Sequence, residues 1–233
     1  MLISILKRIL IYVIGLFLLS SGVAFSAHCG IGVSPVGTVP VALRDSFALE
    51  LGLCSTLAMI FYMFVQMALL GKKYKLINLT QIFASFLFGF FIFVAESIMR
   101  YICAQIGQPM DPELYAIKLL YLFASFICIG TGVYLYLEAK MINLPADGVF
   151  VAFHQRTGIS IPKSKIMFDI SATALAALIA FTFAPNHEIG FIREGTIIAC
   201  FAVGMIIGFW KRTLKDKVQK FIYSDLNGDL AQN

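Results

Sequence analysis

The chain alternates long apolar runs with short polar connections, and each run is long enough to cross a lipid bilayer as a helix. A helix rises about 1.5 Å per residue, so about 20 apolar residues cover a hydrocarbon core of about 30 Å. Six runs approach this length: residues 9–27, 53–70, 76–98, 114–137, 166–184 and 191–210. The pattern predicts an all-α membrane protein with six transmembrane helices.

The two halves of the chain share a pattern at a shift of 110 positions, between residues 22–45 and 132–155. The identical positions are Gly22/Gly132, Val23/Val133, Pro35/Pro145, Val39/Val149, Val41/Val151 and Ala42/Ala152. Each half contributes three spans, so the second half enters the membrane from the opposite side. We therefore predict two inverted three-helix repeats, 1–113 and 114–210, followed by a basic cytoplasmic tail over 211–233.

Each half also carries a short apolar connection after its first span. Ser34 followed by Pro35 fits the N-cap and first position of a helix, and Pro40 predicts a bend or a tight start. Pro145 takes the place of Pro35 in the second copy, with Asp147 in the first turn. Two placements are open. The short helices are re-entrant, with their N-termini meeting near the midplane, or they lie along the interface as amphipathic caps.

Composition excludes a soluble globular domain. Hydrophobic residues make up 60% of the chain and charged residues 13%, whereas soluble domains are about 25% charged. With the N-terminus inside, only Arg44, Arg100, Lys118 and Arg193 of the 18 basic residues lie outside, so both termini are predicted to be cytoplasmic. The net charge of +5 is thereby explained by topology, and no nucleic-acid partner is expected.

The candidate solute-binding residues are small or polar positions of the two short helices. They are Ser34, Gly37, Thr38, Asn143, Asp147 and Gly148. If both N-termini meet inside the membrane, these residues flank a shared cavity. Free amides at a helix N-terminus attract anions, whereas Asp147 attracts a cation or a proton. The sequence therefore leaves the charge of the solute open.

Three further charged residues are candidates for coupling or gating: Asp169, Arg193 and Glu194. Asp169 lies inside an apolar run, where an ionisable group costs about 3 kcal/mol. The alternative is an ion pair with Lys165, one helical turn earlier. Arg193 and Glu194 open the sixth span. Adjacent helical residues point about 100° apart, so we expect these two to pair with other helices.

Two spacings predict structural contacts. Glu96 and Arg100 are four residues apart at the outer end of the third span and fit a surface ion pair. Gly204 and Gly208 form a GxxxG step, which predicts helix packing.

The cysteines and histidines indicate no cofactor or metal. The five cysteines contain no CxxC pair and are expected as small packing residues, with a Cys29–Cys103 bridge as an alternative. The three histidines have no partner at metal-ligand spacing. An enzyme is not expected, since no nucleophile, base and orienting group lie together. A lipid-headgroup enzyme acting through His154 or His187 would need phosphate-binding residues that the sequence lacks.

Four motifs carry a family resemblance. They are Gly30-Ile31-Gly32-Val33-Ser34-Pro35 with the following TVPVAL, Leu144-Pro145-Ala146-Asp147-Gly148, Lys165-Ile166-Met167-Phe168-Asp169, and Ile192-Arg193-Glu194-Gly195-Thr196-Ile197-Ile198. Their order resembles the bacterial YczE/YyaS/YitT family of integral membrane proteins. The resemblance implies a bacterial cytoplasmic (inner) membrane and a candidate transporter or a membrane protein of unknown role, and it supplies no established ligand residue.

The predicted function is transport of a small polar or charged solute by alternating access, with the site at the repeat interface. The alternative is a membrane scaffold or regulatory membrane protein that moves no solute. The expected partners are the lipid bilayer and a small solute or ion, and a homodimer is left open.

Overall fold

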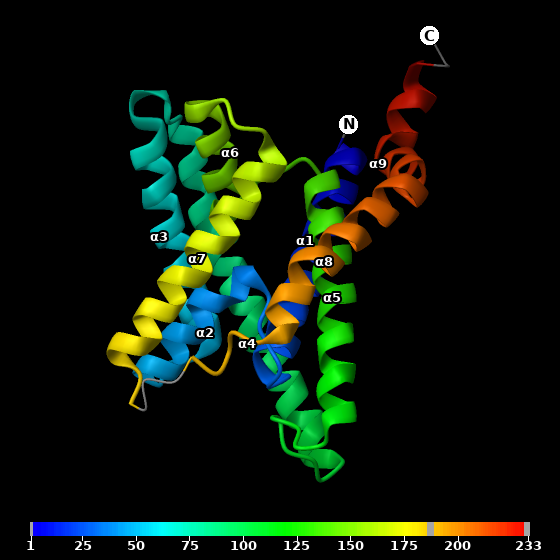
Figure 1. The fold of residues 1–233 in the computed structure, drawn as a ribbon. Helices are drawn as coiled ribbons and strands as arrows, with labels where there is room; N and C mark the ends of the chain where they lie inside the picture. Colours follow the sequence, from blue (N-terminus) through cyan, green and yellow to red (C-terminus); the bar gives the residue numbers. More distant parts are fainter. Residues whose placement is uncertain (1, 186–188, 231–233) are drawn as a thin grey trace.

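The computed structural model describes residues 2–185 and 189–230, and these fold into helices without strands. The nine α-helices in this part of the chain are α1 (Leu2–His28), α2 (Pro35–Phe47), α3 (Leu51–Leu70), α4 (Gln81–Gln105), α5 (Tyr115–Glu138), α6 (Pro145–Thr157), α7 (Ile161–Phe183), α8 (Glu194–Thr213) and α9 (Lys215–Leu230) (Figure 1). Two 3₁₀ turns, Gly71–Lys73 and Leu76–Thr80, join α3 to α4. Six helices are long and apolar enough to span a membrane: α1, α3, α4, α5, α7 and α8. The predicted fold class is confirmed.

The third span begins where it is predicted, at Leu76, and extends beyond residue 98 to Gln105. Its first residues form a 3₁₀ turn, and the α-helix α4 begins at Gln81. The side chains of Leu76 and Ile77 are exposed and belong to the 3₁₀ turn. At the other end, Glu96 is buried against α1, so its charge does not end the helix.

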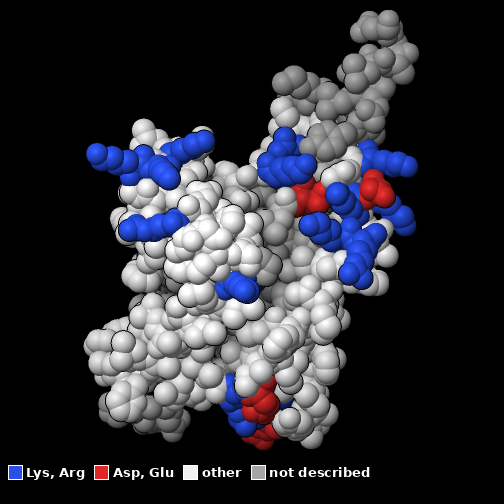
Figure 2. Space-filling view, turned by 45° about the horizontal axis from the view of Figure 1, so that its top comes forward, with Lys and Arg blue, Asp and Glu red and all other residues white. Residues whose placement is uncertain are grey.

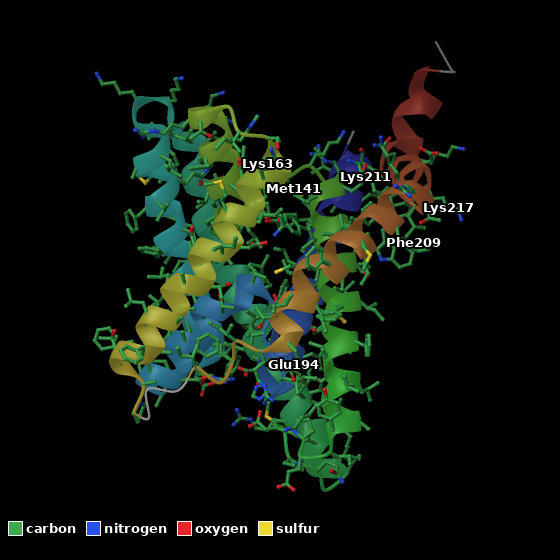
Figure 3. All side chains as sticks on the ribbon, in the orientation of Figure 1. Met141, Lys163, Glu194, Phe209, Lys211 and Lys217 are labelled. Atoms are coloured by element: carbon green, nitrogen blue, oxygen red, sulfur yellow. The ribbon has the colours of Figure 1, made fainter. Side chains whose placement is uncertain are left out.

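Charged side chains are unevenly distributed between the two ends of the bundle. Figure 2 shows Lys and Arg gathered at the end that is turned forward, with a smaller mixed patch of acidic and basic side chains at the opposite end. Lys163, Lys211 and Lys217 lie toward the end where α1 begins, and Glu194 lies toward the other (Figure 3). This is the asymmetry on which the predicted orientation depends, and the orientation itself stays a prediction.

The first helices of the two halves, α1 and α5, pack closely along each other through glycines. A Cβ added to Gly15 would lie 2.6 Å from the backbone nitrogen of Tyr136, and one added to Gly22 would lie 2.6 Å from the Ile129 side chain. A Cβ on Gly132 would lie 2.6 Å from the carbonyl oxygen of Gly15. Small residues allow such close approach between membrane helices. This pair forms the centre of the bundle.

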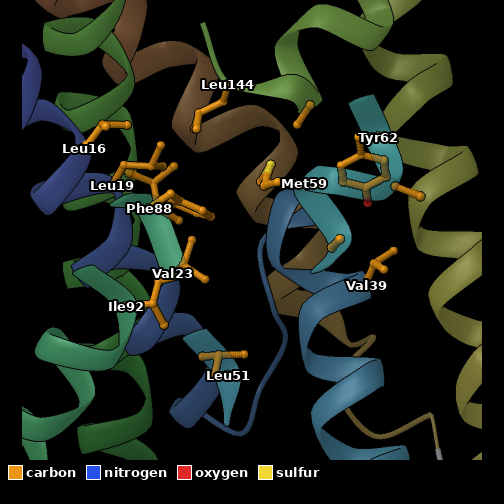
Figure 4. Packing of buried hydrophobic residues seen from close by; sticks show 14 of the residues in the cluster. Leu16, Leu19, Val23, Val39, Leu51, Met59, Tyr62, Phe88, Ile92 and Leu144 are labelled. Atoms are coloured by element: carbon orange, nitrogen blue, oxygen red, sulfur yellow. The ribbon is translucent and has the colours of Figure 1, made fainter. Parts of the chain in front are cut away.

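The main hydrophobic cluster surrounds this central pair. Leu16, Leu19 and Val23 of α1 face Phe88 and Ile92 of α4 (Figure 4). The cluster continues through Leu51, Met59 and Tyr62 of α3 to the starts of the short helices. In contrast, many large apolar side chains on the outside are exposed, as expected where lipid is the solvent.

Helix bounds repeat at the same shift of 110 residues that relates the two halves in sequence. The spans α1 and α5 end at His28 and Glu138, and α2 and α6 cover 35–47 and 145–157. Packing partners are exchanged in the same way, since α2 lies against α7 and α6 lies against α3. This regularity is what a duplication requires. The inverted relation of the halves stays a prediction.

One interface is missing from this exchange. Helix α3 packs along α4, where Gly52 and Gly89 bring the backbones together: a Cβ on either glycine would lie 2.5 Å from the other's carbonyl oxygen. Pro162 and Ala199 take the places of these glycines in the second half. Among the described residues, the equivalent helices α7 and α8 form no comparable interface. The second half is therefore open where the first half is closed.

The tail forms the helix α9, and its first part is packed on the bundle. The Ser4 hydroxyl donates to the Ile222 carbonyl at 2.9 Å, and the Gln219 amide donates to the Glu138 carboxylate at 2.8 Å. Residues 215–222 are thus fixed against α1 and α5.

Candidate functional site

A cavity of about 710 Å³ lies between α7 and α8, in the place of the missing interface. Cavities of roughly 300–1,000 Å³ are typical of small-molecule sites. Leu19, Ile129 and Val133 of the central pair close its inner side. The walls contributed by α7 and α8 are mainly apolar: Ile166, Ile170, Ala174, Ile197, Phe201 and Ile207. The site is a largely hydrophobic chamber with few polar groups.

The N-terminus of α2 lines this cavity. Ser34, Pro35 and Val36 share it with Leu19, which lies near the middle of α1. From there α2 runs along α7, and Phe47 meets Phe183 at the end of that helix, with ring centroids 5.6 Å apart. The start of α2 therefore lies at the same cavity as Leu19 of α1, and its end lies beside the end of α7.

The segment between α1 and α2 is held by hydrogen bonds to residues at the start of α8. The Val33 amide donates to the Phe191 carbonyl at 3.0 Å and to the Thr196 hydroxyl at 3.1 Å, and the Gly195 amide donates to the Ile31 carbonyl at 2.9 Å. Gly32 has φ +129, and a Cβ there would lie 2.5 Å from the Thr196 nitrogen. Only glycine fits this position. The sequence analysis did not identify this role of Gly32 and Thr196.

The N-terminus of α6 reaches the same cavity from the other end of the bundle. Leu144, Ala146 and Asp147 line it. The preceding segment is tied to α1, because the Tyr12 hydroxyl donates to the Ile142 carbonyl at 2.8 Å and the Arg8 guanidinium donates to the Ala139 carbonyl at 2.9 Å. The first turns of both short helices therefore meet at one cavity.

Three charged side chains line the cavity wall near α6. Lys165 and Asp169 of α7 form an ion pair at 2.8 Å, which confirms the alternative predicted for Asp169. Asp147 is half-buried in the first turn of α6 and has no hydrogen-bond or ion-pair partner among the described residues. The wall thus carries two carboxylates and one ammonium group. Of the predicted residues, the structure brings Ser34, Asp147 and Asp169 together here.

The other predicted solute contacts are placed away from the cavity lining. The Thr38 hydroxyl is fully buried and donates to the Pro35 carbonyl at 2.8 Å within α2. Gly37 packs against Val33, and Gly148 packs against the Gln66 side chain. Asn143 is exposed in the segment before α6.

Arg193 and Glu194 differ from their predicted pairing. The Arg193 Nε lies 3.5 Å from the Glu194 carboxylate, so the neighbours pair with each other. The expectation that they pair with other helices was wrong because Arg193 is the N-cap of α8 and has an extended backbone, to which the 100° rotation of a helix does not apply. Arg193 also donates to the Gly30 carbonyl at 3.1 Å. Neither residue lines the cavity.

The two glycines of the GxxxG step in α8 make no close contact with another helix in the described structure, although Ile206 between them packs against Gly130 of α5. A Cβ on Gly204 or Gly208 would meet nothing within 4 Å, so the predicted packing is not formed within this chain. Gly204 instead lines the cavity. The motif allows close approach but does not by itself supply a partner.

A cluster of His28, Glu96 and Asp111 lies at the opposite end of α1. His28 Nε2 is 2.8 Å from Glu96, and Nδ1 is 2.6 Å from Asp111. Both ring nitrogens can donate to carboxylates only when the imidazole is protonated. The hydrogen bond from His28 lowers the pKa of the Asp111 carboxyl. The predicted Glu96–Arg100 pair is replaced by Glu96–His28, because the packing of α4 on α1 buries Glu96.

The remaining candidates for chemistry do not form a second site. All five cysteines are free thiols, so the alternative Cys29–Cys103 bridge is not formed. The part of the chain that the structure describes holds no group of three side chains able to bind a metal ion. His154 hydrogen-bonds the Ile159 carbonyl at 2.6 Å, and His187 lies outside the described residues.

Comparison with known proteins gives a family but no activity. Residues 6–212, which include all six spans except the first residues of α1 and the last of α8, match the model of a family of unknown function, DUF6198. No curated protein and no solved structure matches the chain. The resemblance to the YczE/YyaS/YitT family is not supported by name and stays a prediction. The chain belongs to the DUF6198 family of unknown function.

Proposed function

We propose that this protein transports a small polar or charged solute across the bacterial cytoplasmic membrane. One observation carries the proposal: the first turns of two short helices, one from each half, line a single cavity that also holds Asp147, Lys165 and Asp169. Ionisable groups inside a membrane domain are costly and mark solute or ion pathways. Broken helices that begin at a central site are typical of secondary transporters.

The proposal includes the arrangement of the halves in the membrane. We infer two inverted repeats with re-entrant short helices, which the exchanged packing of α2 on α7 and α6 on α3 supports. The distribution of Lys and Arg supports cytoplasmic termini, and the resemblance to the YczE/YyaS/YitT family supports a bacterial inner membrane. Access would alternate when α7 closes on α8 while α3 separates from α4.

Solute flux into proteoliposomes tests the proposal. The panel would contain ethylamine, choline, glycine, lactate, sulfate and one long-chain amine, dodecylamine, and currents on a solid-supported membrane would be the measurement. We expect a current with at least one of these solutes for the wild type and its loss in Asp147→Ala and Asp169→Ala, both of which should remain folded. Asp45→Asn is the matched control, since Asp45 pairs with Arg44 away from the cavity.

The same experiment separates transport from the alternative, a scaffold or regulatory membrane protein. A scaffold would give no current with any solute of the panel in correctly folded wild-type protein. That result would contradict the proposal.

A further inference from the structure

The cavity opens sideways, between α7 and α8, onto the surface that lipid covers in a membrane. Three apolar residues on its lining are largely exposed: Ile170 by 64%, Ile197 by 66% and Phe201 by 69%. Lining residues that are also exposed place the rim of the cavity on the outer surface of the bundle. A molecule dissolved in the bilayer could enter here without crossing an aqueous opening.

The charges of the cavity favour a cationic group. Asp169 is already paired with Lys165 at 2.8 Å, whereas Asp147 has no partner in the described structure. An unpaired carboxylate in apolar surroundings is costly, and a bound ammonium group would offset this cost. An anion would be repelled. A neutral molecule could at most donate a hydrogen bond and would leave the charge of Asp147 uncompensated.

A hydroxyl group without a partner strengthens this assignment. Tyr136 of α5 lines the cavity, is 1% exposed, and has a hydroxyl without a hydrogen-bond partner among the described residues. Buried hydroxyl groups normally have one. An ammonium group carries three donors and can use a hydroxyl oxygen as well as a carboxylate.

The apolar part of the cavity is elongated. Its lining follows α7 from Lys165 to Ala177, and the twelve steps between these residues correspond to about 18 Å of helix. We propose that this cavity binds an amphipathic amine, with its ammonium group at Asp147 and its hydrocarbon chain lying between α7 and α8. The inference rests on the proposed transport site and specifies the class of its substrate.

Equilibrium binding of tritiated dodecylamine to the protein in phosphatidylcholine nanodiscs tests the inference. We expect saturable binding above that of empty discs, competed by other long-chain amines. Dodecanol keeps the chain but lacks the charge, butylamine keeps the charge but lacks the chain, and dodecanoate reverses the charge. None of the three should compete at equal concentration. Competition by butylamine equal to that by dodecylamine, or by dodecanoate, would overturn the inference.

Two variants connect binding to the proposed contact. Asp147→Asn should raise the Kd about tenfold or more, and Asp45→Asn should leave it unchanged. Unchanged binding by Asp147→Asn would refute the assignment.

Adding phosphatidylethanolamine to the discs distinguishes a membrane lipid from a free amphiphile, since only a lipid ligand predicts that phosphatidylethanolamine competes with dodecylamine. If a second copy of this chain fills the cavity, binding disappears in discs with two copies, and the assignment to an amine is wrong.

The two experiments can contradict the transport proposal and the ligand assignment independently of each other. Saturable dodecylamine binding without any solute current would contradict transport and leave the ligand assignment intact. A current that requires Asp147, in a protein that does not bind dodecylamine, would support transport and overturn the ligand assignment.

Discussion

At the residue scale, the balance of charge in the cavity decides what it can bind. Asp147, Lys165 and Asp169 sum to one negative charge when all three are ionised. Each can be removed singly, and the two members of the ion pair can be removed together. The set therefore allows net charge to be varied separately from the shape of the apolar wall.

The charge set gives a graded prediction for dodecylamine binding. Asp169→Asn frees the Lys165 ammonium group to neutralise Asp147, so binding should weaken about as much as in Asp147→Asn. Lys165→Ala leaves two carboxylates and should bind more tightly than wild type. The double variant Lys165→Ala/Asp169→Asn restores a single unpaired carboxylate and should bind as wild type does. The four Kd values measure this order. Equal weakening in the double variant and in Asp169→Asn would contradict it.

The His28 cluster gives a prediction for pH. Because the hydrogen bond from His28 lowers the pKa of Asp111, the ionised cluster stabilises the fold above the ordinary pKa of about 4. This stabilisation is lost as pH falls through the lowered pKa. Asp111→Asn should therefore lower the melting temperature at pH 7, by the equivalent of about 1 kcal/mol or less for so exposed a side chain, and have no effect near pH 3.

Thermal unfolding in detergent at the two pH values is the measurement. Glu113 is exposed in the same connection, so Glu113→Gln serves as the control and should leave the melting temperature unchanged at both pH values. A deficit in Asp111→Asn that persists at pH 3 would show that the cluster does not act through its charge.

The local sequence pattern is enough to identify some residues of the candidate site, but it does not identify others. Asp147 and Asp169 stand out because a carboxylate in an apolar run needs a reason, and Ser34 because it begins a helix. Thr38 lies on the buried side of α2, and nothing in a single short helix shows which side faces a cavity. The partner of Glu96 could not be predicted, because His28 is 68 residues away and only the packing of α1 on α4 brings it near.

At the element scale, glycines divide into those that support helix contact and those that do not. Of the glycines at the central interface, the repeat marks Gly22 and Gly132 but not Gly15. The GxxxG spacing of α8 predicts close packing, yet Gly204 and Gly208 meet no neighbouring helix in the described structure. Small residues give a capacity for close packing in both places. The tertiary arrangement decided where this capacity is used.

The contrast predicts different responses to the same substitution. Gly132→Ala would place a methyl group 2.6 Å from the Gly15 carbonyl oxygen, against backbone that cannot yield easily, and should cost about 1–3 kcal/mol or prevent folding. Gly208→Ala meets nothing within 4 Å and should be tolerated. Melting temperature and yield of monodisperse protein in detergent are the measurements. A comparable loss in both variants would show that helix propensity or an unseen partner, and not the α1–α5 contact, controls the outcome.

At the scale of the whole molecule, the helices of the two halves correspond in the described structure, and the contact between the last two spans differs. Equivalent helices have matching bounds, and their packing partners are exchanged between the halves. The sequence predicts this much because duplication leaves glycines and prolines at a constant spacing. The sequence does not predict the opening between α7 and α8. The pattern of apolar residues shows that both helices form, but it does not show how closely they pack against each other.

If the opening is the entrance of the site, joining α7 to α8 should stop its function without unfolding the protein. Cys200 provides one anchor on α8, since it lines the cavity and is exposed, whereas Cys29, Cys54 and Cys103 are buried. Cys128 is partly exposed and is replaced by serine in every protein compared. Ile170→Cys supplies a second anchor on α7, at the exposed rim. A short bismaleimide that links the two within one chain should abolish dodecylamine binding and solute current. Wild type treated with the same reagent keeps Cys200 but lacks the second anchor, so it should retain both dodecylamine binding and solute current.

Mass spectrometry would verify the link, and an unchanged melting temperature would verify the fold. Full activity after complete cross-linking would mean that α7 and α8 need not separate, and the entrance would have to lie elsewhere.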